Sequence, residues 1–387
     1  MKENKEELLE GSTVSESTEV SSKSFSRREI LKVGAFTVVA VAGSSLLVAC
    51  SNGNNDETPK PDKRTITNVN GTEITIPYEV TKVAALFGPS YERVVVVGAE
   101  DRIMCDGDFH IDGWPWSNLI FKYVNTLPGI ENAHADFHVE DLIAMGVQLV
   151  FCWANQSQVD MITNAGMVAV PSAGTGKARD IVETIRVFAD IFNDELAHEQ
   201  ATAYAQYFDD TFAMVKARTA NVAIRPKVYL GNTTLLATVS ASSDMAEVID
   251  AAGGVLASID LPAGSSTNVN VEQVLQWNPD YIFLDHAGSS GNASSELVIS
   301  EAKASGSFNS VTAFQNDHVF ATPTGAFFWD SGIQKILYLV YIAKTIHPTL
   351  FADVDLKAML IDFYKQFYFY TLTDNQATRI LNHQDPL

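Results

Sequence analysis

Apolar and polar residues alternate most regularly in the middle of the chain. Residues 195–218 contain no Pro or Gly, and apolar side chains recur there at three- and four-residue steps: Leu196, Tyr204, Tyr207, Phe208, Phe212 and Val215. Acidic residues open this stretch, and Lys216 and Arg218 close it, as the helix dipole favours. The pattern predicts a helix about 36 Å long, which exceeds the width of one small domain.

Short apolar runs alternate with amphipathic segments on both sides of this helix. Before it, the pattern predicts a hairpin at 65–77, strands at 82–87, 102–106, 148–153 and 167–171, and helices at 91–98, 139–145 and 156–165. After it, the pattern predicts strands at 227–230, 280–285 and 318–322, and helices at 244–252, 271–277, 296–304, 332–345, 355–368 and 374–381.

This order predicts an α/β protein with two doubly wound, Rossmann-like lobes and a ligand cleft between them. The first lobe is expected at residues 65–178 and the second at 221–387. Linking helices at 179–220 include the single long helix, which would act as a strut between the lobes.

The first part of the chain is typical of an export segment. Residues 26–32, Ser-Arg-Arg-Glu-Ile-Leu-Lys, resemble a twin-arginine signal, and the uncharged run 33–49 follows it. Leu47-Val48-Ala49-Cys50 resembles a lipobox, so residues 1–50 predict a lipoprotein signal peptide with Cys50 lipidated. An uncleaved membrane anchor is the alternative. Residues 51–64 are polar and predict a disordered tether, which places the folded part outside the cell membrane and anchored to it.

Composition narrows the range of partners. The 387 residues are 46% hydrophobic and carry a formal net charge of −21, which predicts a globular protein that does not bind nucleic acid.

Cys105 and Cys152 fall on predicted strands that flank the first strand of the first lobe. Two flanking strands lie about 10 Å apart, too far for a disulfide, so two free, buried thiols are expected.

Doubly wound lobes bind ligands beyond the carboxyl ends of their strands. The residues expected there are mostly aromatic or amide-bearing, and Lys177 is the nearest basic side chain. The predicted ligand-binding residues are Ser90, Tyr91, Trp114, Trp153, Asn155, Asn232, His286, Phe327 and Trp329.

Several motifs resemble one protein family. Residues 271–283 match the "E-Q-hydrophobic…N-P-D-hydrophobic" segment of the substrate-binding lipoproteins that serve ABC importers of iron–siderophore, corrinoid and related ligands. Residues 252–254, 318–323 and 342–364 fit the same pattern, whereas residues 145–150 depart from its usual "L-K-P-D" motif.

The resemblance implies a monomeric binding protein, without catalytic residues or a cofactor of its own, that delivers its ligand to an ABC permease. It also implies that one surface carboxylate per lobe, Glu140 and Glu272, docks onto the permease. Each is otherwise simply an acid in a first helical turn.

The scarcity of basic residues disfavours an anionic tris-catecholate and favours a neutral iron chelate or a corrinoid. A small oxyanion such as molybdate, known in this family, is the alternative; it would bind the N–H groups of residues 88–90 and 174–176.

Metal-ion and enzymatic functions are more remote possibilities. Two sets of residues have ligand chemistry for a free metal ion: His134, Asp136, His138 and Glu140; and Asp108 with His110. Residues 174–177 lack the full phosphate-loop pattern, and there is no G-x-S-x-G motif. Ser90, His286 and Asp330 could be drawn as a triad, so a membrane-tethered enzyme stays a remote alternative, as does a surface adhesion module.

Overall fold

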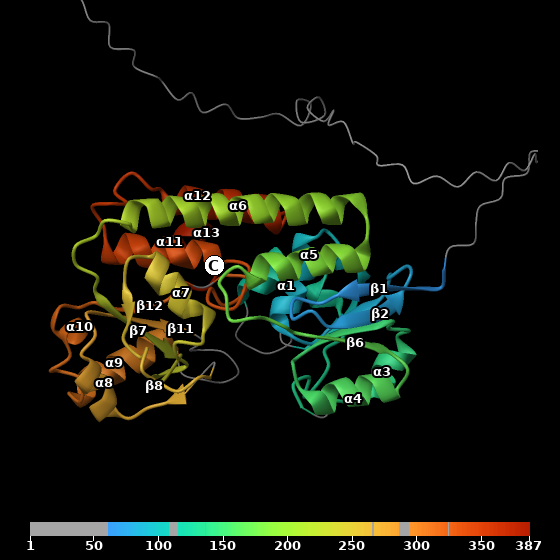
Figure 1. Cartoon of the computed structure of the whole chain (residues 1–387), viewed down its shortest axis with the longest axis horizontal. Helices are drawn as coiled ribbons and strands as arrows, with labels where there is room; N and C mark the ends of the chain where they lie inside the picture. The colour runs from blue at the N-terminus through green and yellow to red at the C-terminus, as the bar shows by residue number, and fades with distance from the viewer. Residues whose placement is uncertain (1–60, 108–114, 136, 265–266, 286–293, 324) are drawn as a thin grey trace, which may run out of the picture. The chain divides into compact units, whose positions relative to one another are not determined.

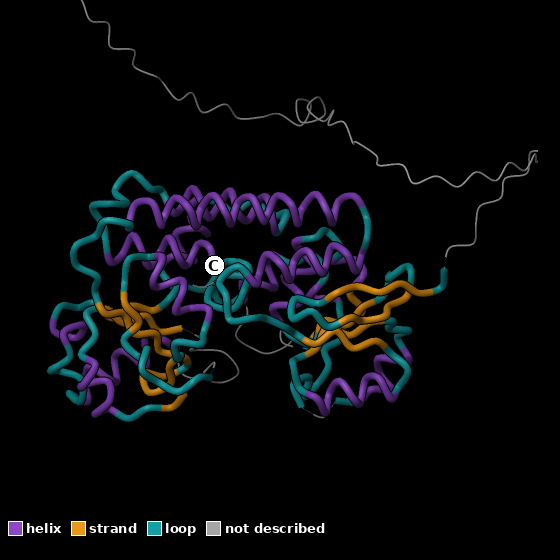
Figure 2. Tube along the Cα trace, viewed as in Figure 1, coloured by secondary structure: helices purple, strands orange, loops and turns teal. Residues whose placement is uncertain are grey.

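Two separate β-sheets organise the computed structural model, which describes residues 61–107, 115–135, 137–264, 267–285, 294–323 and 325–387. A two-stranded hairpin, β1 (Lys63–Thr67) with β2 (Glu73–Pro77), precedes them and confirms the hairpin prediction. Figure 2 shows the strands of the two sheets as separate groups joined through helices. The prediction of an α/β fold with two sheet-based lobes is confirmed.

The first sheet is parallel and four-stranded, in the order β4-β3-β5-β6. Its strands are β3 (Val83–Ala85), β4 (Ile103–Asp106), β5 (Leu149–Cys152) and β6 (Val168–Pro171). They are short apolar runs because helices cover both faces of the sheet. The helices of this half are α1 (Gly88–Val96), α2 (Pro115–Ile120), α3 (Val139–Ala144) and α4 (Gln156–Asn164).

The second sheet has a parallel centre and antiparallel additions. Strands β7 (Lys227–Asn232), β11 (Tyr281–Asp285) and β12 (Val319–Ala321) run parallel in the order β7-β11-β12, and the short β9 (Val255–Leu256) pairs with the other side of β7. Two strands that the sequence pattern did not predict, β8 (Thr234–Thr238) and β10 (Thr267–Asn268), extend this edge in antiparallel sense. The helices beside this sheet are α7 (Asp244–Ala251), α8 (Val271–Trp277), α9 (Ser295–Ser305) and α10 (Thr312–Gln315).

A layer of long helices joins the two halves. It consists of α5 (Asp180–Phe192), α6 (Glu195–Thr219), α11 (Lys335–Ile346), α12 (Leu356–Phe367) and α13 (Asp374–Leu381). The long helix predicted at 195–218 is therefore confirmed as α6, which contacts α5 and α1 of the first half and α7 and α11 of the second. Figure 1 shows α6 extending over α11 at one end and over α5 at the other. Within the described residues, no helix has both the length and the hydropathy that crossing a bilayer requires.

Three hydrophobic cores account for this arrangement. One lies beneath the first sheet, against α3 and α4, and one lies beneath the second sheet, against α8 and α10. The third and largest is continuous between the halves, because it contains Val83 and Phe151 of the first sheet, Val228 and Phe283 of the second, and the inner faces of the helical layer. The two sheets therefore share one core, although they share no strand.

The two thiols agree with the sequence prediction. Cys105 on β4 and Cys152 on β5 are free and buried, and β3 lies between their strands. Burial raises the pKa of each thiol to about 12, so neither is a reactive thiolate at neutral pH.

Candidate functional site

The strand order of each sheet reverses at one place, and ligands of doubly wound proteins bind outside the carboxyl ends of the strands at such a point. In the first sheet, β3 comes first in the chain and lies between β4 and β5, so the switch point is at β3 and β5. In the second sheet, β7 comes first and lies between β9 and β11, so the switch point is at β7 and β11. These two strand pairs define the candidate site.

Three aromatic rings gather at the switch point of the first sheet. Phe87 lies two residues after the end of β3, and Trp153 directly follows β5; their ring centroids lie 4.5 Å apart at 77°. The imidazole of His134 lies 6.4 Å from Phe87 and 6.3 Å from Trp153, also edge-on. Trp153 is 47% exposed, and His134 is also exposed. We call Phe87, His134 and Trp153 the aromatic trio, and an exposed cluster of this kind offers apolar contact to a ligand.

Two polar side chains meet at the switch point of the second sheet. Asn232 ends β7 and Asp285 ends β11, and the two residues are direct partners in the strand register. Asn232 is half-buried and accepts a hydrogen bond from the Thr233 hydroxyl at 3.0 Å. The backbone N–H of Thr233 donates to the carbonyl oxygen of Asp285 at 2.8 Å, which closes this end of the strand pair. Asn232 is one of the predicted ligand-binding residues, whereas Asp285 is not, although it ends the predicted strand 280–285.

The segments that follow the strand ends also make contacts between the halves. After β6, the backbone N–H of Ala178 donates to the Glu247 carboxylate on α7 at 2.8 Å. A Cβ at Gly176 would lie 2.9 Å from the carbonyl oxygen of Ser242, so the chain passes close to the second half there. The carboxyl ends of the strands are therefore on the side of each sheet that is turned toward the other half.

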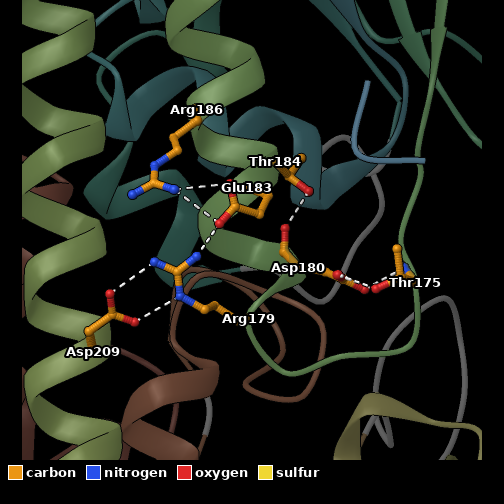
Figure 3. A network of polar contacts seen from close by, with 7 residues as sticks. All are labelled: Thr175, Arg179, Asp180, Glu183, Thr184, Arg186 and Asp209. Atoms are coloured by element: carbon orange, nitrogen blue, oxygen red, sulfur yellow. Dashed lines mark hydrogen bonds and ion pairs between the residues drawn. The ribbon is translucent and has the colours of Figure 1, made fainter. Parts of the chain in front are cut away.

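The turn that follows β6 is held by side chains of α5 (Figure 3). The Asp180 carboxylate accepts from the backbone N–H and the hydroxyl of Thr175 and from the backbone N–H of Lys177. Arg179 reaches the other way and donates two bonds of 2.9 Å to Asp209 on α6. The hydrogen bond from Arg179 lowers the pKa of the Asp209 carboxyl. Because Asp180 occupies the N–H groups of Thr175 and Lys177, these two groups are less available to an oxyanion than the sequence suggested.

The structure separates the predicted site residues into three groups. Trp153 is exposed at the first switch point, Asn155 beside it caps α4 by accepting from the Ser157 N–H, and Asn232 lies at the second switch point. Ser90, Tyr91, Phe327 and Trp329 follow strand ends but are buried. Trp114 and His286 lie outside the described residues, as do Cys50, Asp108, His110 and Asp136.

The buried aromatics pack into the shared core. The Tyr91 hydroxyl donates to Glu100 at 3.1 Å, and its ring packs 5.0 Å from that of Phe121. Trp329 has no exposed surface and lies edge-on to Tyr341. Phe327 packs against Phe328, and its carbonyl oxygen accepts from Gln334. These side chains support the strand-end segments from beneath, so in this conformation their rings are not on a surface that a ligand reaches.

Other predicted features are at the surface. Glu140 is exposed in the first turn of α3, the helix before β5, and Glu272 is exposed in the first turn of α8, the helix before β11. The two carboxylates thus occupy equivalent positions in the two halves.

Among the described residues, no group of three or more His, Cys, Asp or Glu side chains is placed to hold a metal ion. A hollow of about 680 Å³ lies over α11 and α12 and is lined by none of the predicted site residues.

Comparison with known proteins shows which proteins this chain resembles. Residues 162–326 match the periplasmic binding protein family. The chain is 24% identical over 369 residues to the molybdate-binding protein MolA of Haemophilus influenzae. The alignment covers 87% of this chain and 99% of MolA.

Solved structures share the fold. A periplasmic solute-binding protein of Veillonella parvula superposes with a TM-score of 0.66 at 23% identity, covering 83% of this chain and 97% of that one. CeuE of Helicobacter pylori in complex with nickel and histidine gives a TM-score of 0.66 at 19% identity, covering 82% of this chain and 99% of that one. Residues 162–326 therefore resemble periplasmic binding proteins in sequence, and the chain shares the fold of these solved binding proteins.

Proposed function

We propose that this protein is a lipid-anchored, extracytoplasmic receptor that captures an iron chelate or a corrinoid between its two switch points and delivers it to an ABC permease. The observation that carries the ligand class is the exposed aromatic trio at the first switch point. A cluster of edge-on rings with an exposed tryptophan suits a ligand with a large apolar surface. The family consists of transport proteins rather than enzymes.

The charge around the site supports a ligand without a large negative charge. The described residues that follow the strand ends at 86–91, 153–157, 172–176, 232–234 and 322–330 include no Lys or Arg. A strongly anionic chelate would leave several charges without cationic partners there, which is costly in a partly buried site. A neutral hydroxamate chelate or a corrin ring avoids that cost.

Molybdate is the second candidate, and the relationship to MolA favours it, because the similarity extends over nearly the whole of both chains. Molybdate could be held by backbone N–H groups at the start of α1, where Phe87 provides no side-chain cap. In that case the aromatic trio would flank the ion without supplying most of the binding energy.

A thermal-shift screen separates the two. The purified protein is heated with ferric hydroxamate, cobalamin, haem, nickel–histidine or sodium molybdate, each at increasing concentration. A true ligand at 100 times its dissociation constant adds about 2.7 kcal/mol of stability. Stabilisation by a chelate or a corrinoid, but not by molybdate, is expected; stabilisation by molybdate alone would replace the first candidate with the second.

Trp153→Ala tests the role of the trio. For a chelate or corrinoid, the loss of the exposed indole is expected to weaken binding about tenfold, or about 1.4 kcal/mol, measured by isothermal titration. Phe369→Ala is the matched control, because Phe369 is another half-exposed aromatic and belongs to no strand end. Equal affinities for wild type and Trp153→Ala would exclude the trio from the ligand site.

Two further parts of the proposal concern the membrane. Lipidation of Cys50 would keep the protein at the cell surface, so Cys50→Ala should move it from the membrane fraction to the soluble fraction.

Docking by Glu140 and Glu272 would bring one carboxylate of each half to the permease, where rim charges steer association. Charge reversal of both residues should abolish ligand uptake by cells while leaving ligand binding by the purified protein unchanged.

A further inference from the structure

A buried carboxylate of the first half is surrounded by groups of the second half. Glu92 lies on α1 and has no exposed surface. One of its oxygens accepts from the hydroxyl of Tyr368, at the end of α12, and the other accepts from the backbone N–H of Ile333 at 3.3 Å. The side chain of Gln334 also favours the ionised carboxylate and opposes the rise in the pKa of Glu92. Buried carboxylates persist in proteins only with such partners.

The backbone of the second half approaches this carboxylate very closely. A Cβ at Gly332 would lie 2.5 Å from Oε2 of Glu92, which no real contact permits. Gly332 and Ile333 are near the end of the segment that follows β12 and leads into α11. The missing side chain at Gly332 is what lets this segment reach the carboxylate.

The same network continues into the strand-end segment of the second half. Gln334 donates to the carbonyl oxygen of Phe327 at 3.2 Å and accepts from the Tyr364 hydroxyl at 2.6 Å. That hydroxyl accepts in turn from the backbone N–H of Ala326 at 3.1 Å. Residues 326–334 are therefore fixed at both ends by side chains that lead back to Glu92.

On the other side, Glu92 is attached to the strand-end segment of the first half. It lies in the second turn of α1, whose first residues follow Phe87 of the aromatic trio. One carboxylate thus connects the segment after β3, at the first switch point, with the segment after β12, beside the second.

We propose that Glu92 is a positioning residue for ligand capture, which holds residues 326–334 against α1 and thereby sets the spacing between the two switch points. This role goes beyond the proposed ligand class, and only its consequence for affinity rests on the proposed function. When Glu92 is protonated, the contact holds without a buried charge, because the Tyr368 hydroxyl can also accept a hydrogen bond. Ionisation leaves a buried negative charge among mostly neutral donors, so the connection weakens and the spacing becomes less well defined as pH rises.

The surroundings of Glu92 place this change near neutral pH. Burial raises the pKa of Glu92 to about 7, although Tyr368, Ile333, Arg93 and Gln334 all oppose the rise. The other titratable groups that face Glu92 are Tyr204 on α6 and Tyr364 on α12, while Arg93 on α1 also faces Asp244 on α7. The pKa of each of the tyrosines is raised far above neutral, so they remain donors throughout the physiological range.

The spacing can be measured directly with two spin labels. Asn164→Cys on α4 and Gln276→Cys on α8 place one exposed label in each half, in the full chain carrying Cys50→Ser, because the remaining native thiols are buried. Pulsed electron–electron resonance then gives the distance distribution between the labels at pH 5.5 and pH 8.5. The wild type is expected to give a narrow distribution at pH 5.5 and a broader one at pH 8.5.

Three variants decide whether Glu92 is responsible. Glu92→Gln mimics the protonated acid and should be narrow at both pH values, and Tyr368→Phe, which keeps the ring, should be broader than wild type at pH 5.5. Glu100→Gln is the matched control, because Glu100 accepts from the Tyr91 hydroxyl and the Tyr123 N–H, both in the first half. Its distributions should follow wild type. A wild-type distribution independent of pH, or a Glu92→Gln distribution that broadens at pH 8.5, overturns the proposal.

Binding measurements add the functional consequence. Sodium molybdate and a ferric hydroxamate complex are each titrated into wild type and Glu92→Gln at both pH values. For whichever compound binds, the wild-type affinity should be at least about threefold lower at pH 8.5 than at pH 5.5, and the variant should show no such difference. If neither compound binds, the proposed ligand classes fail, while the distance distributions still decide the role of Glu92. A compound that binds with the same pH dependence to both proteins contradicts the link to ligand capture.

Discussion

At the scale of single residues, Glu92 also makes a prediction about stability. Its pKa is about 7 in the folded protein, against 4.5 for the free side chain. Between these values the folded protein binds a proton that the unfolded chain does not, so the free energy of unfolding is highest below pH 4.5 and falls as pH rises through 7. For a fully buried group, this difference is on the order of 3 kcal/mol.

Urea unfolding of wild type and Glu92→Gln at pH 5, 6, 7 and 8 measures this effect. The wild type should lose stability relative to the variant as pH rises, because the variant has no charge to bury. Burial also raises the pKa of Glu100, but both proteins contain Glu100 and the difference between them removes its contribution. Asp353, whose pKa Arg218 lowers to about 2, titrates below this range. If the free energies of unfolding of the two proteins changed equally with pH, Glu92 would already be ionised at pH 5.

The candidate site shows which residue-level features a sequence can predict. The pattern places the ends of β5 and β7 within two residues, so it correctly puts Trp153 and Asn232 at strand ends, and their role in ligand binding stays a prediction. Tyr91 and Trp329 also follow strand ends, yet they are buried, because the direction of a side chain beyond a strand depends on the helix that packs over it. His134 joins Phe87 and Trp153 from a segment 47 residues further along the chain than Phe87, and no local spacing indicates that contact.

At the scale of elements, the pairing of α5 with α6 has both charged and apolar contacts. Arg179 bonds to Glu183 on its own helix and to Asp209 on α6, and Arg186 bonds to Glu183 as well (Figure 3). All four of these side chains are between 39% and 48% exposed. Beneath them, Ile185 is fully buried in the shared core. Exposed ion pairs contribute little to stability, whereas a buried aliphatic side chain contributes much more.

The expected result is a large difference between two substitutions on the same helix. Arg179→Ala should lower the free energy of unfolding by less than about 1 kcal/mol, and Ile185→Ala should lower it by about 2–5 kcal/mol. Chemical denaturation measures both, and repeating it at 1 M salt should remove most of the Arg179 effect. An Arg179→Ala loss as large as that of Ile185→Ala would show that the ion pairs, rather than the core, hold the two helices together.

The sequence predicts an element well when the element is stabilised by its own residues, and poorly when it depends on neighbouring elements. Helix α6 was found with its length because 25 residues without Pro or Gly, with one cap and a regular apolar face, admit little else. Strands β8, β9 and β10 were not found, since two of them have only two residues and exist only through their neighbours. The helix expected at 332–345 begins instead at Lys335, because residues 332–334 are held by the Glu92 network.

At the scale of the whole molecule, the shared core decides how the two halves depend on each other. The sheets have no strand in common, which by itself would allow two independent domains. However, Tyr204 of α6 donates to the carbonyl oxygen of Ile333, and Trp116 of the first half donates to that of Gln384 near the end of the chain. The largest core continues through both halves. Each half therefore needs the other to bury the part of its apolar surface that belongs to the shared core.

Residues 59–387 should consequently unfold in a single transition, with equal calorimetric and van't Hoff enthalpies. Hydrogen exchange should give the same opening free energy for β3 in the first sheet and β11 in the second, because both lose the shared core in the same event. A fragment of residues 221–387 should fail to fold, since α11 and α12 would expose the surfaces that pack on α6. Two resolved transitions, or different opening free energies for the sheets, would show independent lobes. In that case Glu92 could not hold the two lobes at a fixed spacing. Its contact with the second lobe would break while both lobes were still folded.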